Sequence, residues 1–179
     1  NNSGVAVPRL LWIGLKADAS TNVFLNQSFS VASEDDWQLA EVLSGISMVQ
    51  AATSEAFVPQ MLNYESLEGV SFKKGCYPGQ EVVARSQFRG TLKRRAFIVS
   101  GPSPMQAGQE VFAADDAEQA CGTVASAAQF QSSSNALLAP WWGIVLMQIS
   151  ASEQALHLGD AKGPLLQVSA LPYTLLEDI

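Results

Sequence analysis

The chain has 179 residues and a formal net charge of −7, with 47% apolar and 15% charged residues. This composition is typical of a globular protein with a buried core, and it argues against a disordered chain. The longest apolar run, residues 136–147, is broken by Pro140 and Gly143. It is shorter than the roughly 20 residues that span a membrane, so we expect no membrane partner.

The first half of the chain predicts a mixture of helix and strand. Ser33, followed by three acidic residues, predicts the start of a helix that Ser44 and Gly45 end. Apolar patterns predict strands at residues 5–17 and 46–51, and an extended piece or an irregular connection at 23–31. Mixed periodicity at residues 57–64 predicts a loop with one helical turn.

The stretch KKGCYPGQE, residues 73–81, contains a predicted tight turn. Pro78 and Gly79 stand at its two central positions, the combination that a type II turn favours. Gly75 is a second point where the backbone can take a positive φ or approach a ligand closely. The sequence therefore predicts a shaped backbone around Cys76.

A helix is predicted directly after this turn, over residues 80–88, with Gly90 as its end. Its free N–H groups and positive dipole end lie near the turn. Cys76, beside Lys73 and Lys74, is thus placed in surroundings that favour the thiolate. The same geometry suits an incoming carboxylate or phosphate.

Seven of the ten cationic residues lie within 23 positions, between Lys73 and Arg95, against a single acid, Glu81. On an acidic protein such a cluster predicts an anion-binding surface, with a solvated basic face as the alternative. Arg85 and Arg89 are four residues apart and share a helix face, so we predict that they clamp one anion together.

Three other charged positions concern the same surface. Glu81 lies at the predicted helix start, where it either caps the helix or accepts N–H groups from a heterocyclic ligand. Arg94 and Arg95 enter a predicted strand and point to opposite faces, so at most one of them joins the arginine clamp.

The chain contains two cysteines, Cys76 and Cys121, and one histidine, His157. A secreted disulfide scaffold normally carries more cysteines, so we expect a cytoplasmic protein. These residues are too few for a structural zinc site or a four-cysteine cluster, and we predict no metal held by the chain alone. Cys121 and His157 lie in strand-like stretches, and we interpret both as packing residues.

From Arg94 onward the sequence predicts a series of short strands separated by turns, as in a small antiparallel barrel or sandwich. Trp141 and Trp142 are interpreted as core residues of this part, with ligand stacking as the alternative. We therefore divide the chain into an α+β part, residues 1–92, and an all-β part, residues 93–179. The predicted strands are residues 95–100, 109–113, 122–127, 136–148, 155–158 and 165–171.

Residues 74–81, KGCYPGQE, resemble the K-G-C-x-x-G-Q-E signature of the YgfZ-type folate-binding, tRNA-modification-associated protein family. That family is related to the aminomethyltransferase (T-protein) of the glycine cleavage system. The tail at residues 171–173 also looks like the end of these proteins. Flanking similarity covers residues 57–60, 69–73, 83–85, 88–90 and 93–95.

The resemblance implies an α+β fold, in which part of a T-protein-like folate-binding domain is followed by a small antiparallel C-terminal β-barrel. The chain looks like the middle and C-terminal portion of such a protein, so we expect an incomplete folate site. The implied cofactor is tetrahydrofolate or a derivative, and the essential residue is Cys76. The predicted folate-binding residues are Lys74, Tyr77, Gln80, Glu81, Arg85 and Arg89.

Three functions follow from these observations. The first is a non-enzymatic accessory protein that supports iron–sulfur enzymes and thereby tRNA modification, with iron–sulfur enzymes or cluster-assembly proteins as partners. The second is a folate-dependent aminomethyl transferase. The third is direct RNA binding through the basic segment, in which the aromatic residues that stack on bases are few.

Overall fold

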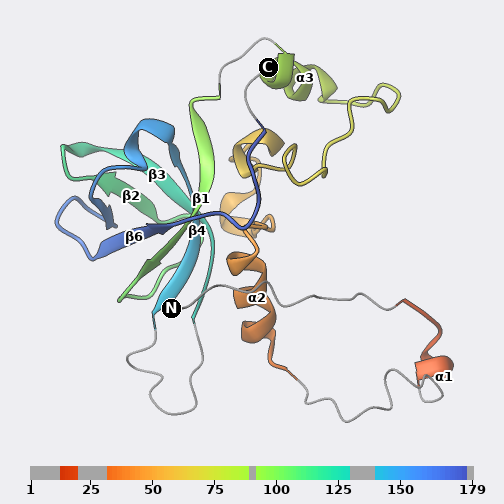
Figure 1. Ribbon diagram of the computed structural model, residues 1–179, viewed down its shortest axis with the longest axis horizontal. Helices are drawn as coiled ribbons and strands as arrows, with labels where there is room; N and C mark the ends of the chain where they lie inside the picture. The colour runs from red at the N-terminus through yellow and green to blue at the C-terminus, as the bar shows by residue number, and fades with distance from the viewer. Residues whose placement is uncertain (1–12, 20–31, 89–91, 130–139, 177–179) are drawn as a thin grey trace.

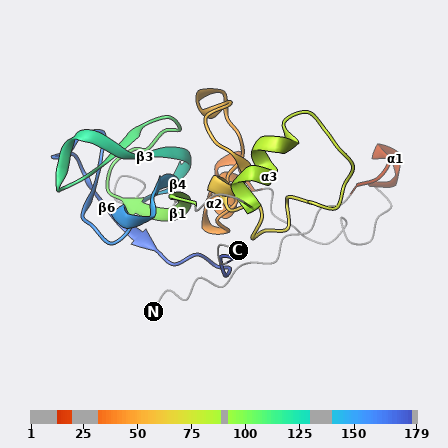
Figure 2. The same ribbon diagram turned by 90° about the horizontal axis from the view of Figure 1, so that it is seen from above.

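The computed structural model describes residues 13–19, 32–88, 92–129 and 140–176. A β-barrel forms one side of the molecule, and helices and turns from the first part of the chain lie along it (Figures 1 and 2). The helical elements are α1 (Lys16–Ala19), α2 (Glu34–Leu43), η1 (Ala51–Thr53), η2 (Pro59–Leu62), α3 (Gln80–Phe88) and η4 (Ile149–Ala151).

Helix α2 begins and ends where the sequence predicts. The Ser33 hydroxyl accepts the N–H of Asp36, and the Asp36 carboxylate accepts the N–H of Ser33, which forms a capping box. The backbone hydrogen bond from Ser33 lowers the pKa of Asp36. After Ser44 the chain leaves the helix through Gly45, whose φ of +68° favours glycine.

Two strand predictions in this part are wrong. Residues 46–50 have no regular structure and Ala51 begins η1, because no neighbouring strand pairs with them among the described residues and Tyr64 Oη donates to Ser47 O. Residues 13–15 are also irregular, and α1 follows them. Ile13 is 85% exposed and gains nothing from a sheet. The remainder of that strand and the piece at 23–31 lie outside the described residues.

The described strands close into a six-stranded antiparallel barrel in the order β1-β4-β3-β2-β5-β6, which confirms the predicted α+β class with a C-terminal barrel. Strand β1 pairs with β4 along its whole length and closes the barrel against β6. Strand β3 begins earlier than predicted, and residues 136–139 lie outside the described part. The strands are β1 (Arg94–Gly101), β2 (Glu110–Ala113), β3 (Asp116–Gln129), β4 (Trp141–Gln148), β5 (Leu156–Leu158) and β6 (Leu165–Ser169).

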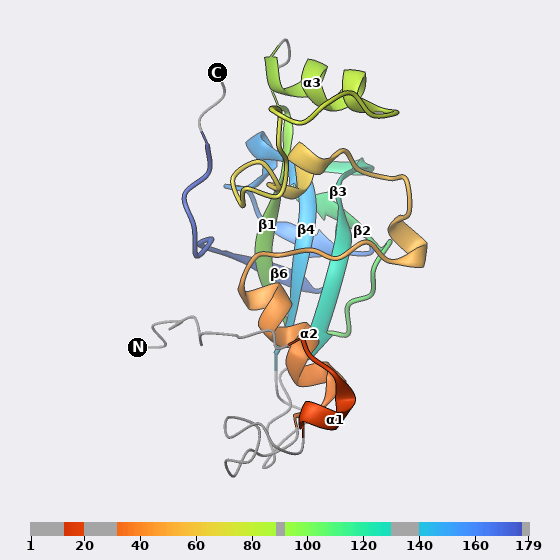
Figure 3. The ribbon, with the colours of Figure 1, turned by 90° about the vertical axis from the view of Figure 1, so that its right-hand side faces the viewer.

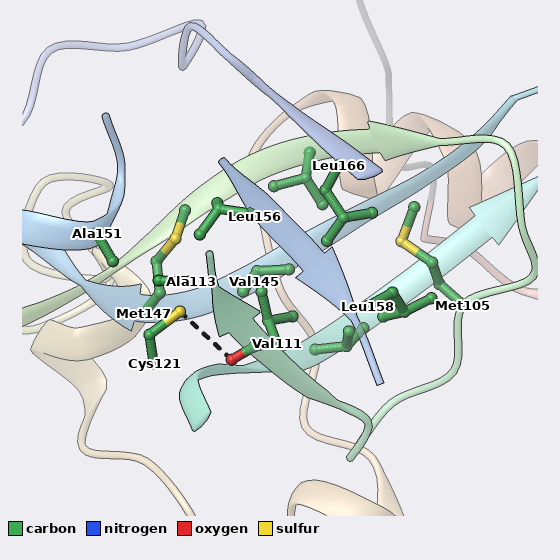
Figure 4. Packing of buried hydrophobic residues seen from close by; sticks show 12 residues of the cluster. Met105, Val111, Ala113, Cys121, Val145, Met147, Ala151, Leu156, Leu158 and Leu166 are labelled. Atoms are coloured by element: carbon green, nitrogen blue, oxygen red, sulfur yellow. Dashed lines mark hydrogen bonds between the residues drawn. The ribbon is translucent and has the colours of Figure 1, made fainter. Parts of the chain in front are cut away.

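The barrel interior is a continuous apolar core that includes Val111, Val145 and Met147 (Figure 4). Cys121 lies in this core and its thiol donates to Val111 O at 3.3 Å, while burial raises the pKa of the thiol. His157 is half-buried, with Nδ1 2.8 Å from Gly163 O. Both residues are packing residues, as predicted.

A second apolar cluster joins the two parts of the chain. Leu39 and Val42 of α2 and Leu62 of η2 pack with residues of β1, β3 and β4. Helix α2 lies along these strands (Figure 3). Trp142 packs against this cluster and Trp141 against the barrel core, so the structure supports the packing interpretation of both tryptophans. The division near residue 92 remains a prediction.

The tail after β6 returns to the first part of the chain (Figure 1). Tyr173 Oη donates to Gly45 O at 2.9 Å and accepts a hydrogen bond from Asn63 Nδ2 at 3.2 Å. The N–H of Leu176 donates to Ser66 Oγ at 3.0 Å. Through these hydrogen bonds the tail holds the segments that follow α2 and η2 close to the barrel.

A buried ion pair lies beside this tail. Arg95 NH1 and Glu65 Oε1 are 2.6 Å apart, and their side chains are 6% and 2% exposed. Arg95 NH2 also donates to Leu176 O at 3.0 Å. Arg94 is only half-buried, which agrees with the opposite faces predicted for the two arginines. Arg95 is thus a structural residue and does not belong to an exposed anion-binding surface.

We expect Glu65→Gln to lower the free energy of unfolding by about 3 kcal/mol, because it removes the counter-ion of a buried arginine charge. The exposed Arg85–Glu81 pair provides a matched control, since the same two residue types there are 68% and 82% exposed. Glu81→Gln is expected to cost less than about 0.5 kcal/mol. Urea unfolding curves measure both, and equal losses would contradict the structural role of Arg95.

We expect Tyr173→Phe to destabilise the protein by about 1–2 kcal/mol, because Gly45 O loses its donor and Asn63 Nδ2 loses one acceptor. Tyr77→Phe is the control, because the Tyr77 side chain is exposed, and its cost should stay below about 0.5 kcal/mol. Thermal unfolding followed by circular dichroism compares the two variants. A Tyr173→Phe midpoint equal to that of the parent would remove the fastening role of the tail.

Candidate functional site

The predicted type II turn is present at the start of α3. Gly79 has φ = +84°, and the N–H of Gln80 donates to Tyr77 O at 3.2 Å. A Cβ added to Gly79 would meet open space, so the requirement for glycine there is conformational. Gly75 does not have a positive φ, so of the two alternatives given for it only close approach to a ligand remains. No described atom lies within 4 Å of a Cβ added at Gly75.

Helix α3 follows with the predicted bounds, Gln80–Phe88. Arg85 NH2 donates to Glu81 Oε1 at 2.8 Å, so Glu81 accepts from an arginine of its own helix. Both side chains are exposed, and the pair contributes little to stability. Arg89 lies outside the described residues, and the predicted clamp by Arg85 and Arg89 therefore remains a prediction.

Cys76 is a free and exposed cysteine, whereas Cys121 is buried. Lys73 and Lys74 beside it are also exposed. The loop that carries these residues and α3 lie at one end of the molecule, away from the barrel strands (Figures 1 and 3). Cys76 is consequently the thiol that a large partner or reagent can reach.

A hollow of about 310 Å³, here called the motif hollow, lies against this loop. Lys74 and Tyr77 line it, so the structure brings these two predicted site residues together. Cys76, Gln80, Glu81 and Arg85 do not line it. The other lining residues are Pro59, Tyr64, Gly69, Val70, Ser71 and Val83.

Tyr64 gives the motif hollow an aromatic wall. Its hydroxyl donates to Ser47 O, and burial raises the pKa of Tyr64, with the charge of Glu41 as a smaller cause. The phenol is therefore neutral and held in place at physiological pH. With Tyr77 it supplies flat apolar surface on which a ring can pack.

Few contacts attach α3 to the rest of the protein, and the helix has no buried residue. Gln60, which is fully buried in η2, donates from Nε2 to Val83 O of α3. The rings of Phe72 and Phe88 meet edge to face, with centroids 5.3 Å apart. Val82 and Phe88 remain more than half exposed.

Gln60 is the positioning residue that the sequence interpretation missed. A signal was available, because Gln60 is a polar residue in a largely apolar turn directly after Pro59, within a stretch of family similarity. A buried amide in such a place normally has a hydrogen-bond partner in another element. The identity of that partner, Val83, required the tertiary structure.

The described residues also bear on three other features: a metal site, a membrane-spanning helix and the basic segment. They contain no group of three or more His, Cys, Asp or Glu side chains that are arranged to hold a metal ion. None of the helices in those ranges has the length and apolar character needed to cross a membrane. The basic segment presents fewer available cations at the surface than its sequence suggests, because Arg95 is buried against Glu65 and Arg85 pairs with Glu81.

Comparison with known proteins finds curated relatives of this chain. No family model matches the chain. Several curated relatives carry the name "tRNA-modifying protein YgfZ". The protein of Sodalis glossinidius is 33% identical over 175 residues, 95% of this chain and 52% of the relative. That of Serratia proteamaculans is 33% identical over 161 residues, 86% of this chain and 46% of the relative. That of Yersinia pestis (strain Pestoides F) is 34% identical over 149 residues, 79% of this chain and 42% of the relative.

The matches cover between 79% and 95% of the chain. The chain spans about half the length of the curated relatives that it matches. On this sequence similarity, together with the signature turn and the closed barrel, the chain belongs to the YgfZ family.

Proposed function

We propose that this protein binds tetrahydrofolate and supports iron–sulfur enzymes in the cytoplasm, and thereby tRNA modification, through the thiol of Cys76. The observation that carries the proposal is an exposed thiol in a loop whose neighbouring side chains, Lys74 and Tyr77, line a hollow. The name of the relatives, tRNA-modifying protein, supports the process in which it acts.

The motif hollow suits one part of a folate molecule. Tyr64, Tyr77 and Pro59 provide apolar surface for a flat ring, and the ammonium of Lys74 suits a carboxylate. The volume of about 310 Å³ is at the lower limit of about 300–1,000 Å³ for ligand pockets. The hollow therefore accommodates a portion of the ligand, and we propose that further protein surface encloses the remainder.

Arg85 is a second candidate for the anionic part of folate. Its present partner is Glu81, and both side chains are exposed, so exchange of Glu81 for a ligand carboxylate costs little. Arg85 lies outside the lining of the motif hollow, where it suits the distal glutamate tail of the ligand better than the ring. Glu81, once released, becomes an acceptor for ligand N–H groups.

The position of Cys76 favours an accessory protein over a transferase. A transferase needs its reactive group against the bound substrate, but Cys76 does not line the motif hollow. Cys121 is buried in the barrel and cannot join Cys76 in binding a cluster. We therefore propose that Cys76 acts on a partner protein. Direct RNA binding has less support, because Arg95 is buried and Arg85 is paired with Glu81.

We expect Cys76→Ser in the full-length protein to abolish rescue of iron–sulfur enzyme activity in cells that lack this protein. Its free energy of unfolding should change by less than about 0.5 kcal/mol, because the side chain is exposed. Cys121→Ser is the control: it is expected to lower stability, since Cys121 is packed in the core, and to retain rescue. Full rescue by Cys76→Ser would disprove the role of the thiol.

We expect Tyr77→Ala to weaken tetrahydrofolate binding to the full-length protein about tenfold, because a ring loses its stacking surface. Val82→Ala is the matched control, since Val82 is an exposed apolar residue of α3 that does not line the motif hollow. Titration calorimetry measures both. The 179-residue chain should bind more weakly than the full-length protein, and equal affinities would show that the motif hollow is a complete site.

A further inference from the structure

A larger hollow of about 540 Å³ lies between α2 and the barrel and has no lining residue in common with the motif hollow. We call it the α2 hollow. Helix α2 lies toward the end of the barrel opposite α3 (Figures 1 and 3). The lining residues used below are Trp37 and Glu41 of α2, Met48 and Gln50 of the following segment, Met105 and Trp141.

The walls of the α2 hollow contain two tryptophans and two methionines. Trp37 comes from α2 and is 52% exposed, although Leu39 and Val42 of the same helix are buried in the second apolar cluster. Trp141 comes from β4, and its other contacts are with the barrel core. Met48 is 60% exposed at the edge. Two tryptophans from separate elements line the hollow, and an indole offers a flat face on which a ring can stack.

The charge of the α2 hollow is negative. Glu41 lines it, and Glu34 lies two turns earlier on the same face of α2, where it accepts a hydrogen bond from Gln38 Nε2 at 3.3 Å. No lysine or arginine is found among the lining residues in the described part of the chain. Indole faces attract cations and the carboxylates add to this attraction, whereas an anionic ligand is repelled.

We propose that the α2 hollow is a second ligand site, which binds a small planar heteroaromatic cation through Trp37, Trp141 and Glu41. Its volume lies within the range of about 300–1,000 Å³ that ligand pockets occupy. A polyanion such as folate is a poor ligand here, because the sign of the charge is opposite to that at Lys73 and Lys74. The inference is independent of the proposed folate function.

Three probes with one ring system test the charge preference: N-methylquinolinium as the cation, quinoline as the neutral molecule and quinoline-2-carboxylate as the anion. In ligand-observed NMR titrations at pH 7.5 the cation should bind about tenfold more tightly than the anion, with quinoline between them. The protein is the complete 179-residue chain, and the titration is repeated on full-length protein. Equal affinities for the three probes, or no binding of the cation at millimolar concentration, would overturn the proposal.

Two variants locate the binding. Trp37→Ala should weaken binding of N-methylquinolinium about tenfold, and Glu41→Gln should reduce the preference for the cation over quinoline, leaving the part that the indole faces supply. Phe88→Ala, which removes an exposed aromatic residue of α3, is the matched control and should change nothing. Identical effects of Trp37→Ala and Phe88→Ala would contradict the site.

Sedimentation velocity tests whether a second copy of the chain covers the hollow instead of a small ligand. A dimer that dissociates in the Trp37→Ala variant would show that it does, and would overturn the proposal.

Discussion

Burial of α2 and η2 against the barrel strands is the constraint on which the rest of the structure depends. Ala125 and Ala128 of β3 belong to the same apolar cluster as Leu39 of α2, and their small side chains allow a helix to approach the strand closely. Because η2 is fixed by the same cluster, Gln60 reaches Val83, which is 23 residues further along the chain. Packing in the second apolar cluster therefore determines where the signature turn lies, although no residue of the turn belongs to that cluster.

The weak attachment of α3 has a physical consequence for its role. A nine-residue helix without a buried side chain is marginal in water, and its order comes from Gln60, from the ring contact of Phe72 with Phe88 and from its turn. Elements with few buried contacts open at low free-energy cost. The exposed thiol thus lies in a loop next to a weakly attached helix, a position from which it can adapt to a partner.

Local patterns predicted the elements well, since capping residues, the Pro78–Gly79 turn and strand alternation act within a few residues. The strand predicted at residues 46–51 failed because a strand requires a partner, which local alternation does not reveal. The sequence counts Arg95 in the basic segment and does not reveal its ion pair, because its partner, Glu65, is 30 residues earlier. Both hollows were missed for the same reason: their walls come from segments that only the tertiary fold brings together.

Ion pairing lowers the positive potential that the basic segment produces outside the protein. Counted in the sequence, the segment from Lys73 to Arg95 has a large positive charge, but the field of a buried ion pair is that of a short dipole, and it falls off faster than that of a free cation. Arg95 therefore adds little to the potential outside the protein. Lys73 and Lys74 are exposed at the signature loop, whereas Glu34 and its acidic neighbours lie on α2, toward the other end. An approaching polyanion is repelled by most of this acidic protein and guided to the loop that carries Cys76.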